Sequence, residues 1–280
     1  MKIIDVRLRP PYKSLRNSFL YHGYLTASQI QFRKNMGLSD SEAVKQQSMP
    51  LLFQEMEEVN IVKAVVCPRV TDGGSNEELA MLVDEYPDKF IGMAHIEPYD
   101  TASALENIIK FVVTGSCTGI YLEPGFRMEK ELMHAHDKRL FPVYELCTDK
   151  NIPIILQYGG GKNSTKYYTP TDIDDIVENF PKLRIMISHG GWPQCMSFIH
   201  QAYSHEFVYL APDCYFAGYP GSADYICAAN GILQDKIVFG SAFPFYSLHD
   251  AVRFYHENLN SSVAEKIFYL NAKQFFNLNN

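Results

Sequence analysis

Eight short runs rich in apolar and β-branched residues recur along this 280-residue chain, and segments with helical periodicity separate them. The runs span residues 2–8, 61–67, 90–96, 118–123, 152–157, 184–189, 207–211 and 236–241. Apolar positions at helical spacing mark other segments, around residues 51–59, 105–112, 173–180 and 262–276. Strands that alternate with helices form parallel sheets, and eight of them predict an α/β fold with a single (β/α)8 TIM barrel.

One connection is much longer than the others. Residues 10–48, rich in Tyr, Arg, Gln and Ser, leave the first strand at the end where barrels carry their active sites. Long connections in compact domains are usually functional. We therefore expect this insertion to form a lid or a dimer arm within one domain of residues 1–280. A surface excursion with no role at the site is the alternative.

Composition narrows the expected partners. The formal net charge is -7, whereas nucleic acids and acidic membranes attract basic proteins, so neither is expected as a partner. The chain has no run of eighteen apolar residues and no leader-like apolar segment at its start. Its six cysteines are scattered without close pairs, which is typical of reduced thiols. These features lead us to expect a cytoplasmic protein.

The carboxyl ends of the strands carry many polar residues, and active sites of TIM barrels lie at these ends. The candidates are Arg7, Arg9, Cys67, His95, Glu97, Tyr121, Glu123, Gln157, His189, Asp213 and Ser241. We expect His95 and Glu97 to be hydrogen-bonded residues of a structural turn, and Cys67 to fill space.

Arg7 and Arg9 stand one residue apart, and strand alternation predicts that they share a face with Asp5. Two guanidiniums in a pocket are costly unless an anion or carboxylate side chains neutralise them. If this strand lines the barrel, the pair predicts an anion site. If the strand is an exposed edge, the arginines are merely solvated.

The segments 152–157 (IPIILQ), 180–191 (FPKLRIMISHGG), 237–244 (IVFGSAFP) and 271–276 (NAKQFF) are similar to successive landmarks of one family. This is the amidohydrolase-related family, in the branch of metal-dependent hydrolase barrels that includes aminocarboxymuconate semialdehyde decarboxylase and lactone hydrolases. The resemblance runs from the first strand to the last helix. It implies a hydrolase or decarboxylase that acts on a small carboxylate compound, and a homodimer or higher homo-oligomer.

The same resemblance shows where this chain departs from the family pattern. Arg7-Leu8-Arg9 stands where relatives carry a metal-binding His-x-His, Gln157 replaces a histidine, and Ala242 replaces an aspartate. His189 is retained, and in relatives this histidine activates or orients the attacking water. Guanidinium has no lone pair with which to hold a cation, so arginine cannot replace a histidine ligand.

Two catalytic interpretations fit these departures. In the first, Arg7 and Arg9 hold an anionic substrate without a metal, and His189 acts as general acid or base. Glu123 or Asp213 would then orient the histidine or balance the arginines. Tyr121, Gln157 and Trp192 are the further substrate-binding candidates, with Trp192 as a pocket wall.

In the second interpretation, one divalent cation, zinc or manganese, has moved within the barrel to Glu123, His189 and Asp213. A third possibility is a catalytically inactive barrel that only binds an acidic metabolite. The polar replacements argue against simple decay, because loss of function more often leaves small apolar residues. Glu123 and Asp213 can also be plain ion-pair partners of the arginines.

One further pair has the spacing of metal ligands. His134-Ala135-His136 follows the fourth strand, however, and not the first strand, where the family carries its His-x-His. Because spacing alone is a weak signal, we interpret this pair as part of a loop without a metal.

Overall fold

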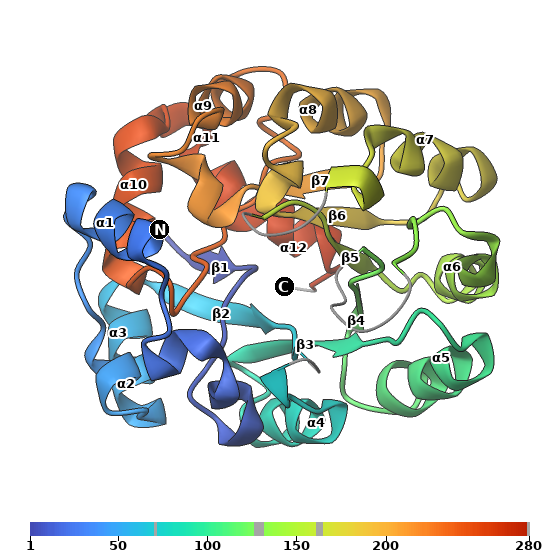
Figure 1. Cartoon of the computed structure of the whole chain (residues 1–280), viewed down its shortest axis with the longest axis horizontal. Coiled ribbons are helices and arrows are strands. Elements are labelled where there is room, and N and C mark those ends of the chain that lie inside the picture. The colour runs from blue at the N-terminus through green and yellow to red at the C-terminus, as the bar shows by residue number, and fades with distance from the viewer. Residues whose placement is uncertain (70–71, 126–131, 161–164, 279–280) are drawn as a thin grey trace.

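Seven parallel strands form one curled sheet at the centre of the molecule, in the order β1 to β7 (Figure 1). The computed structural model describes the chain except residues 70–71, 126–131, 161–164 and 279–280. The strands are β1 (Ile3–Asp5), β2 (Ile61–Val66), β3 (Phe90–His95), β4 (Gly119–Leu122), β5 (Ile154–Gln157), β6 (Ile185–Ser188) and β7 (Val208–Ala211).

The eighth predicted strand closes the barrel without being a regular strand itself. On one side, the Val238 amide donates to the Leu210 carbonyl of β7 at 2.9 Å. On the other side, the amide of Val6 donates to the carbonyl of Phe239 at 3.0 Å, and that of Arg9 to Phe243 at 3.1 Å. The predicted α/β barrel is therefore confirmed, with an irregular eighth segment that hydrogen-bonds to both edges of the sheet.

Most helices lie around the outside of the sheet, whereas the last one lies behind its centre (Figure 1) and packs Ala272 and Phe275 against residues inside the barrel. The α-helices are α1 (Ala27–Asn35), α2 (Glu42–Lys45), α3 (Met49–Glu58), α4 (Asn76–Glu85), α5 (Thr101–Ile108), α6 (Phe141–Asp149), α7 (Pro170–Asn179), α8 (Cys195–Ser204), α9 (Ser222–Asn230), α10 (Leu248–Asn258), α11 (Ser261–Glu265) and α12 (Asn271–Phe275). The 3-10 helices are η1 (Lys13–Asn17), η2 (Phe19–His22), η5 (Lys138–Leu140), η6 (Thr165–Tyr167), η7 (His189–Gly191) and η8 (Asp213–Phe216), and the π-helical turns are η4 (Ile109–Val113) and η9 (Lys266–Leu270). Within the described residues, no helix is long and apolar enough to cross a bilayer.

Strand alternation separates an inner core from an outer one. Ile154 and Leu156 of β5 belong to the large outer cluster that packs against the helices. Ile155 belongs to the smaller cluster inside the barrel, together with Tyr121 of β4. Because successive strand residues face opposite sides, Gln157 points into the barrel like Ile155. The β4 and β5 ends thus carry polar side chains toward one central site.

The first strand is shorter than the sequence predicts. It ends at Asp5, and the chain bends at Val6 and Arg7. Val6 then joins the inner cluster while Leu8 joins the outer one. Alternation therefore holds through Val6, which faces inward like Ile4, and breaks between Val6 and Leu8. The directions of Arg7 and Arg9 depend on this bend.

The long connection over residues 10–48 spans two neighbouring parts of the barrel. The Tyr12 hydroxyl donates to Glu85 of α4 at 2.8 Å, and the Ser39 amide donates to Asp250 of α10 at 2.7 Å. Between these anchors, the α1 N-terminus is capped by the Thr26 hydroxyl, which accepts a hydrogen bond from the Gln29 amide. The segment is thus fixed to helices at both ends, and a role as lid or dimer arm stays a prediction.

Candidate active site

A hydrogen-bonded network around Arg7 fills the centre of the barrel mouth. The Arg7 guanidinium donates to the Gln157 side-chain oxygen at 2.9 Å and to the Tyr121 hydroxyl at 3.3 Å. The Tyr121 oxygen also lies 2.8 Å from a Glu123 carboxylate oxygen and 2.7 Å from the Gln157 oxygen. Burial raises the pKa of Tyr121 well above its ordinary value, so its hydroxyl keeps its proton. All four side chains are buried and linked to one another.

A second arginine completes this network. The Arg69 Nε atom lies 3.4 Å from one Glu123 carboxylate oxygen, and the His95 Nε2 atom lies 3.7 Å from the other. Glu123 is therefore surrounded by Tyr121, Arg69 and His95. Its charge balances the arginines, which matches the sequence interpretation of Glu123 as an ion-pair partner, although with Arg69 as the near partner.

Arg9 differs from Arg7 in having an unused donor. Its Nε atom is buried and has no hydrogen-bond partner among the described residues. Burial, and then the positive charges of Arg7 and Arg69, lower the pKa of Arg9 to about 10. Arg9 and Arg69 line the same small cavity, which Ser14 and Leu15 close from the long connection. The Asp72 carboxylate lines the cavity too, 3.8 Å from an Arg69 nitrogen, so two guanidiniums face one carboxylate there. The excess positive charge and the buried Arg9 donor favour an anion.

Asp5 anchors the bend that directs the arginines. Its carboxylate accepts from the Arg7 amide at 3.0 Å, from the Ser241 amide at 2.8 Å and from the Ser241 hydroxyl at 2.5 Å. Burial raises the pKa of Asp5 to about 6. The first strand is thereby tied to the irregular eighth segment at the point where the barrel closes.

His189 and Asp213 form a separate pair at the ends of β6 and β7. The His189 Nδ1 atom lies 2.7 Å from one Asp213 oxygen and 2.9 Å from the other. A carboxylate only accepts, so Nδ1 carries the proton and Nε2 keeps its lone pair. Burial lowers the pKa of His189, and Arg7 and Arg9 lower it further, whereas Asp213 acts in the opposite direction. A neutral imidazole with a free Nε2 can act as a general base.

Backbone strain is concentrated around this pair. His189, Asp213 and Ala242 are non-glycine residues with positive φ angles of 58°, 44° and 57°. Each follows one of the last three strand segments at the carboxyl end of the barrel. Such conformations cost about 1–3 kcal/mol each and are common at functional sites, where the surrounding structure holds them.

Aromatic rings form a wall beside His189. The Trp192 ring stacks on Tyr215 with centroids 4.7 Å apart, and the Tyr215 ring meets the imidazole edge-on at 5.5 Å. Tyr219 packs against both Trp192 and Tyr215. Trp192 is half-buried and its indole donates to the Pro220 carbonyl at 2.8 Å. Rings arranged in this way can receive a flat, apolar part of a ligand.

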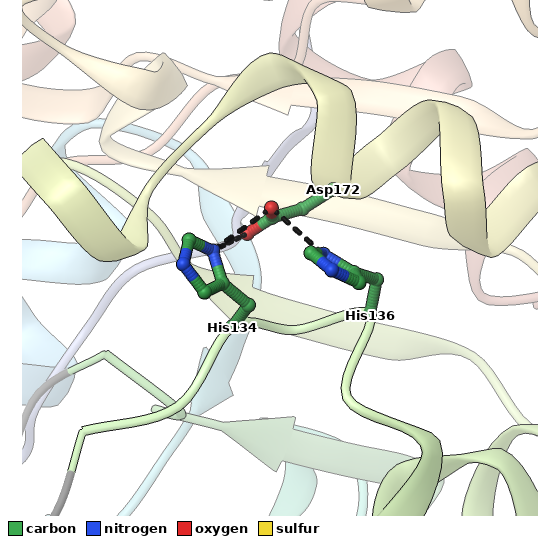
Figure 2. Close-up of side chains that lie close together, drawn as sticks. All are labelled: His134, His136 and Asp172. Atoms are coloured by element: carbon green, nitrogen blue, oxygen red, sulfur yellow. Dashed lines mark hydrogen bonds and ion pairs between the residues drawn. The ribbon is translucent and has the colours of Figure 1, made fainter.

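Within the described ranges, two groups of three side chains bring metal-ligating atoms within 4.8 Å of one another. One group joins His189 and Asp213 to Cys214. The other joins His134 and His136 to Asp172 at the start of α7 (Figure 2). Glu123 belongs to neither group, although one sequence interpretation placed it with His189 and Asp213.

The structure thus brings most of the sequence candidates together in two clusters. Arg7, Tyr121, Glu123 and Gln157 form one, and His189 and Asp213 the other. Sequence analysis missed Arg69, whose signal was its position two residues beyond the end of the second apolar run. It also missed the approach of Asp172 to the histidine pair, for which the sequence carries no signal.

A parallel barrel whose polar residues converge at the carboxyl ends of its strands has the architecture of the TIM-barrel enzymes. The chain belongs to the amidohydrolase family, because the family profile described as Amidohydrolase matches residues 49–278. No protein with a curated function matches the sequence. The resemblance seen in the sequence is therefore confirmed.

Solved structures support the same assignment. An uncharacterised TIM-barrel protein from Bordetella bronchiseptica is 32% identical over 99% of both chains, with a TM-score of 0.89. A 2,6-dihydroxybenzoate decarboxylase from Rhizobium shares the fold over the full length of both chains, at 15% identity and a TM-score of 0.70. A dihydroxybenzoic acid decarboxylase from Polaromonas was solved with bound manganese and the inhibitor 2-nitroresorcinol. Its match covers 100% of this chain and 98% of the decarboxylase chain, at 14% identity and a TM-score of 0.69.

Proposed function

We propose that this protein is an enzyme that hydrolyses or decarboxylates a small carboxylate compound, with arginines in place of the family's usual metal. The observation that carries the proposal is the buried Arg9 Nε, which has no partner among the residues the structure describes and lies beside Arg69 in one cavity. His189 and Asp213 supply the proton transfer. The membership of the chain in the amidohydrolase family supports an enzyme, and the decarboxylase neighbours support a carboxylate substrate.

The residues at the centre of the barrel do not suit a divalent cation. Arg7 lies there as a guanidinium, which only donates hydrogen bonds, and its donors face the Gln157 and Tyr121 oxygens. A dication within about 6 Å of this group would be repelled by several kcal/mol. We therefore derive no catalytic step through a metal at this position, although the Polaromonas decarboxylase holds manganese.

The proposed anion grip uses Arg9 and Arg69. Arg7 already has acceptors within the network, whereas the buried Arg9 Nε donor has none in the part of the chain that the structure describes. A substrate carboxylate would satisfy that donor and neutralise the charges that lower the pKa of Arg9. His189 does not line this cavity. In a hydrolysis, the carboxylate held by Arg9 and the carbon attacked near His189 would therefore lie at different ends of the substrate. In a decarboxylation, the carboxylate itself would be the reacting group.

Hydrolysis is the first candidate reaction, because a neutral His189 can act as its general base. Its lowered pKa keeps Nε2 unprotonated near neutral pH, so it can take a proton from water while the water oxygen attacks a carbonyl carbon. The imidazolium formed then returns that proton to the leaving group. Asp213 holds the Nδ1 proton throughout and stabilises the imidazolium.

Decarboxylation is the second candidate, and the aromatic wall of Trp192 and Tyr215 favours it for a hydroxybenzoate-like substrate. In that reaction the carbon–carboxylate bond breaks, carbon dioxide leaves, and the ring carbon takes a proton. His189 would have to be protonated to donate it, which its lowered pKa disfavours. Hydrolysis of a small aromatic or unsaturated carboxylate is therefore our first choice.

The test is turnover by chelator-treated protein on a panel of small carboxylates, with 2,6-dihydroxybenzoate and carboxylated lactones as probes. We expect a ring-opened acid or released carbon dioxide, detected by mass spectrometry and by gas analysis. Activity should survive the chelator and disappear in His189→Gln. Activity that requires added manganese would overturn the metal-free proposal. Tight binding of a carboxylate without any conversion by the wild type would instead support a barrel that only binds an acidic metabolite.

A further inference from the structure

Two histidines and a buried carboxylate meet between the loop after β4 and the first turn of α7 (Figure 2). The His134 and His136 Nδ1 atoms lie 3.1 Å and 2.9 Å from the same oxygen of Asp172. Figure 2 shows both rings directed at this carboxylate from one stretch of the loop after β4. The rings themselves are one-third exposed, so the group can be reached from solvent.

The Asp172 carboxylate is held in place by the fold. Asp172 is fully buried, and its second oxygen accepts from the hydroxyl of buried Tyr158 at 2.5 Å. The Thr169 hydroxyl, at the N-cap of α7, also donates to this carboxylate. Tyr158 directly follows β5, so the carboxylate is tied to the sheet as well as to its own helix. This arrangement fixes the oxygens before a ligand arrives.

The loop that carries the histidines is fixed as well. The Tyr144 hydroxyl of α6 donates to the carbonyl of Ala135, between the two histidines, at 2.6 Å. Both Ala135 and Tyr144 are fully buried. The Asp137 amide closes the turn on the His134 carbonyl at 3.1 Å. A His-x-His pair in an ordered turn can present both rings to one point.

Asp172 has no fixed positive charge to balance it within the described part of the chain. Its donors there are two hydroxyls and two imidazoles, and neither an arginine nor a lysine of that part pairs with it. A buried carboxylate is costly unless a cation neutralises it. The available solutions are a protonated imidazole or a metal ion.

We propose that His134, His136 and Asp172 form a binding site for one divalent transition-metal ion of the zinc class, separate from the barrel mouth. Zinc binds imidazole nitrogen and carboxylate oxygen at 2.0–2.2 Å, so ligand atoms of a tetrahedral site lie roughly 3.3 Å apart. The observed spacings of 2.9 Å and 3.1 Å need only a small expansion. The exposed Asp175 carboxylate, 3.7 Å from the His136 Nδ1 atom, supplies a further ligand from the next turn of α7.

The ion ties the loop after β4 to α7 and, through Tyr158, to the end of β5. Its role is therefore to hold together segments that flank the mouth of the barrel, and no catalytic step depends on it. Binding of an ion only to the folded state raises the melting temperature, by about 5 °C at a hundredfold excess over Kd in a chain of this size.

The test uses zinc and cobalt with metal-depleted protein. We expect isothermal titration calorimetry to give one zinc ion per chain, and cobalt to give the visible absorption of a tetrahedral nitrogen and oxygen site. His134→Gln and His136→Gln should each abolish the cobalt spectrum and the zinc-dependent rise in melting temperature. Circular dichroism of both variants checks that they fold.

Two matched histidine variants separate this site from others. His205→Gln removes a histidine at the end of α8 whose Nε2 atom lies 3.0 Å from Asp174 of α7. His205 belongs to neither group of metal-ligating side chains found among the described residues. His189→Gln removes the histidine of the other candidate group. Both should keep the zinc ion and the cobalt spectrum. Absence of zinc binding to the wild type, or binding lost in His189→Gln and kept in His134→Gln, would overturn the proposal.

Discussion

The barrel mouth and the His134–His136–Asp172 cluster show opposite ways of balancing buried charge. At the mouth, the three guanidiniums of Arg7, Arg9 and Arg69 outnumber the two carboxylates that pair with Arg69, Glu123 at 3.4 Å and Asp72 at 3.8 Å. The Arg9 Nε donor has no partner among the described residues, so donors are in excess. In the cluster, the donors to one buried carboxylate within the described part of the chain are hydroxyls and imidazoles, with no guanidinium or ammonium group among them. A donor-rich site calls for an anion, and an acceptor-rich site calls for a cation.

This difference shows that two residues spaced as X-x-X do not by themselves determine which ligand a site binds. The sequence resemblance implies a His-x-His where this chain carries Arg7-Leu8-Arg9, while a His-x-His stands here in the loop after β4. The same three-residue spacing therefore suits an anion at the arginine pair and a cation at the histidine pair, because the side chains and their surroundings differ. The comparison predicts that substitutions at the mouth change anion binding and catalysis without affecting zinc, and the reverse for the cluster.

The largest effect is expected from His189→Gln. A positioned general base contributes about 10²–10⁴-fold to a rate, so kcat should fall by that factor while the substrate still binds through Arg9. Steady-state kinetics on the substrate found in the panel measures the loss. His205→Gln is the control, since the Nε2 atom of His205 lies 3.0 Å from Asp174 of α7 and His205 belongs to neither cluster at the barrel mouth. Unchanged kcat in His189→Gln would remove this residue from the mechanism.

Arg9→Gln tests the anion grip. Hydrogen bonds to charged groups contribute about 1.5–3 kcal/mol, so Kd for a bound carboxylate should rise about 10- to 100-fold. Calorimetric titration with 2,6-dihydroxybenzoate is the measurement. Arg253→Gln, which alters an exposed arginine paired with Asp250 and Glu257 on α10, should leave Kd unchanged. Equal affinity in Arg9→Gln would show that the cavity holds no substrate carboxylate.

The contrast also explains what could be read from the sequence. The barrel was predictable because strand and helix periodicities repeat along the chain, and each is a local property. The strand ends then predicted that Arg7, Tyr121, Gln157 and His189 gather at the barrel mouth, since barrel sites occupy a fixed edge. The structure places all four side chains there, and their roles at the site stay predictions. Strand bounds were less certain, and β1 stops at Asp5 because the chain bends toward Ser241, which is far away in sequence.

Contacts between distant residues were beyond prediction. Asp172 meets His136 across 36 residues, through the packing of α7 against a loop, and no pattern in either segment encodes that approach. Arg69 meets Glu123 only because β2 and β4 curl around the same centre. The sequence therefore predicted the kinds of side chain at the mouth, while the partners of each one required the three-dimensional arrangement.

The pH dependence of the reaction tests the environment of His189. Its base form is neutral, so activity is present above its pKa in the folded protein and is lost as the pH falls through it. Burial places this pKa below 6.5, and kcat/KM should fall about tenfold per pH unit only below that value. The folded pKa also lies below the unfolded one, so the stability contributed by this group is lost on acidification.

Asp213→Asn sharpens this measurement. Asp213 is the group that raises the pKa of His189, so its removal should move the acidic limb of the kcat/KM profile to lower pH while reducing kcat. His205→Gln should leave the limb in place. A limb above pH 6.5 in the wild type, or a limb that moves upward in Asp213→Asn, would contradict the neutral, buried imidazole.

The smallest effect is expected from His205→Gln on stability, and it completes the comparison of histidine–carboxylate contacts. The His205 Nε2 atom lies 3.0 Å from Asp174, but His205 is one-fifth exposed and Asp174 nearly half exposed. Solvent screens such a pair, so its loss should lower the free energy of unfolding by at most about 1 kcal/mol. Urea denaturation measures this change.

The corresponding His136→Gln variant should lose more stability when zinc is present than when it is absent, because the His136–Asp172 contact belongs to the proposed zinc site and the His205–Asp174 contact does not. If His136→Gln loses the same free energy of unfolding with and without zinc, the His136–Asp172 contact is an ordinary hydrogen bond, like that of His205 with Asp174, and not part of a zinc site.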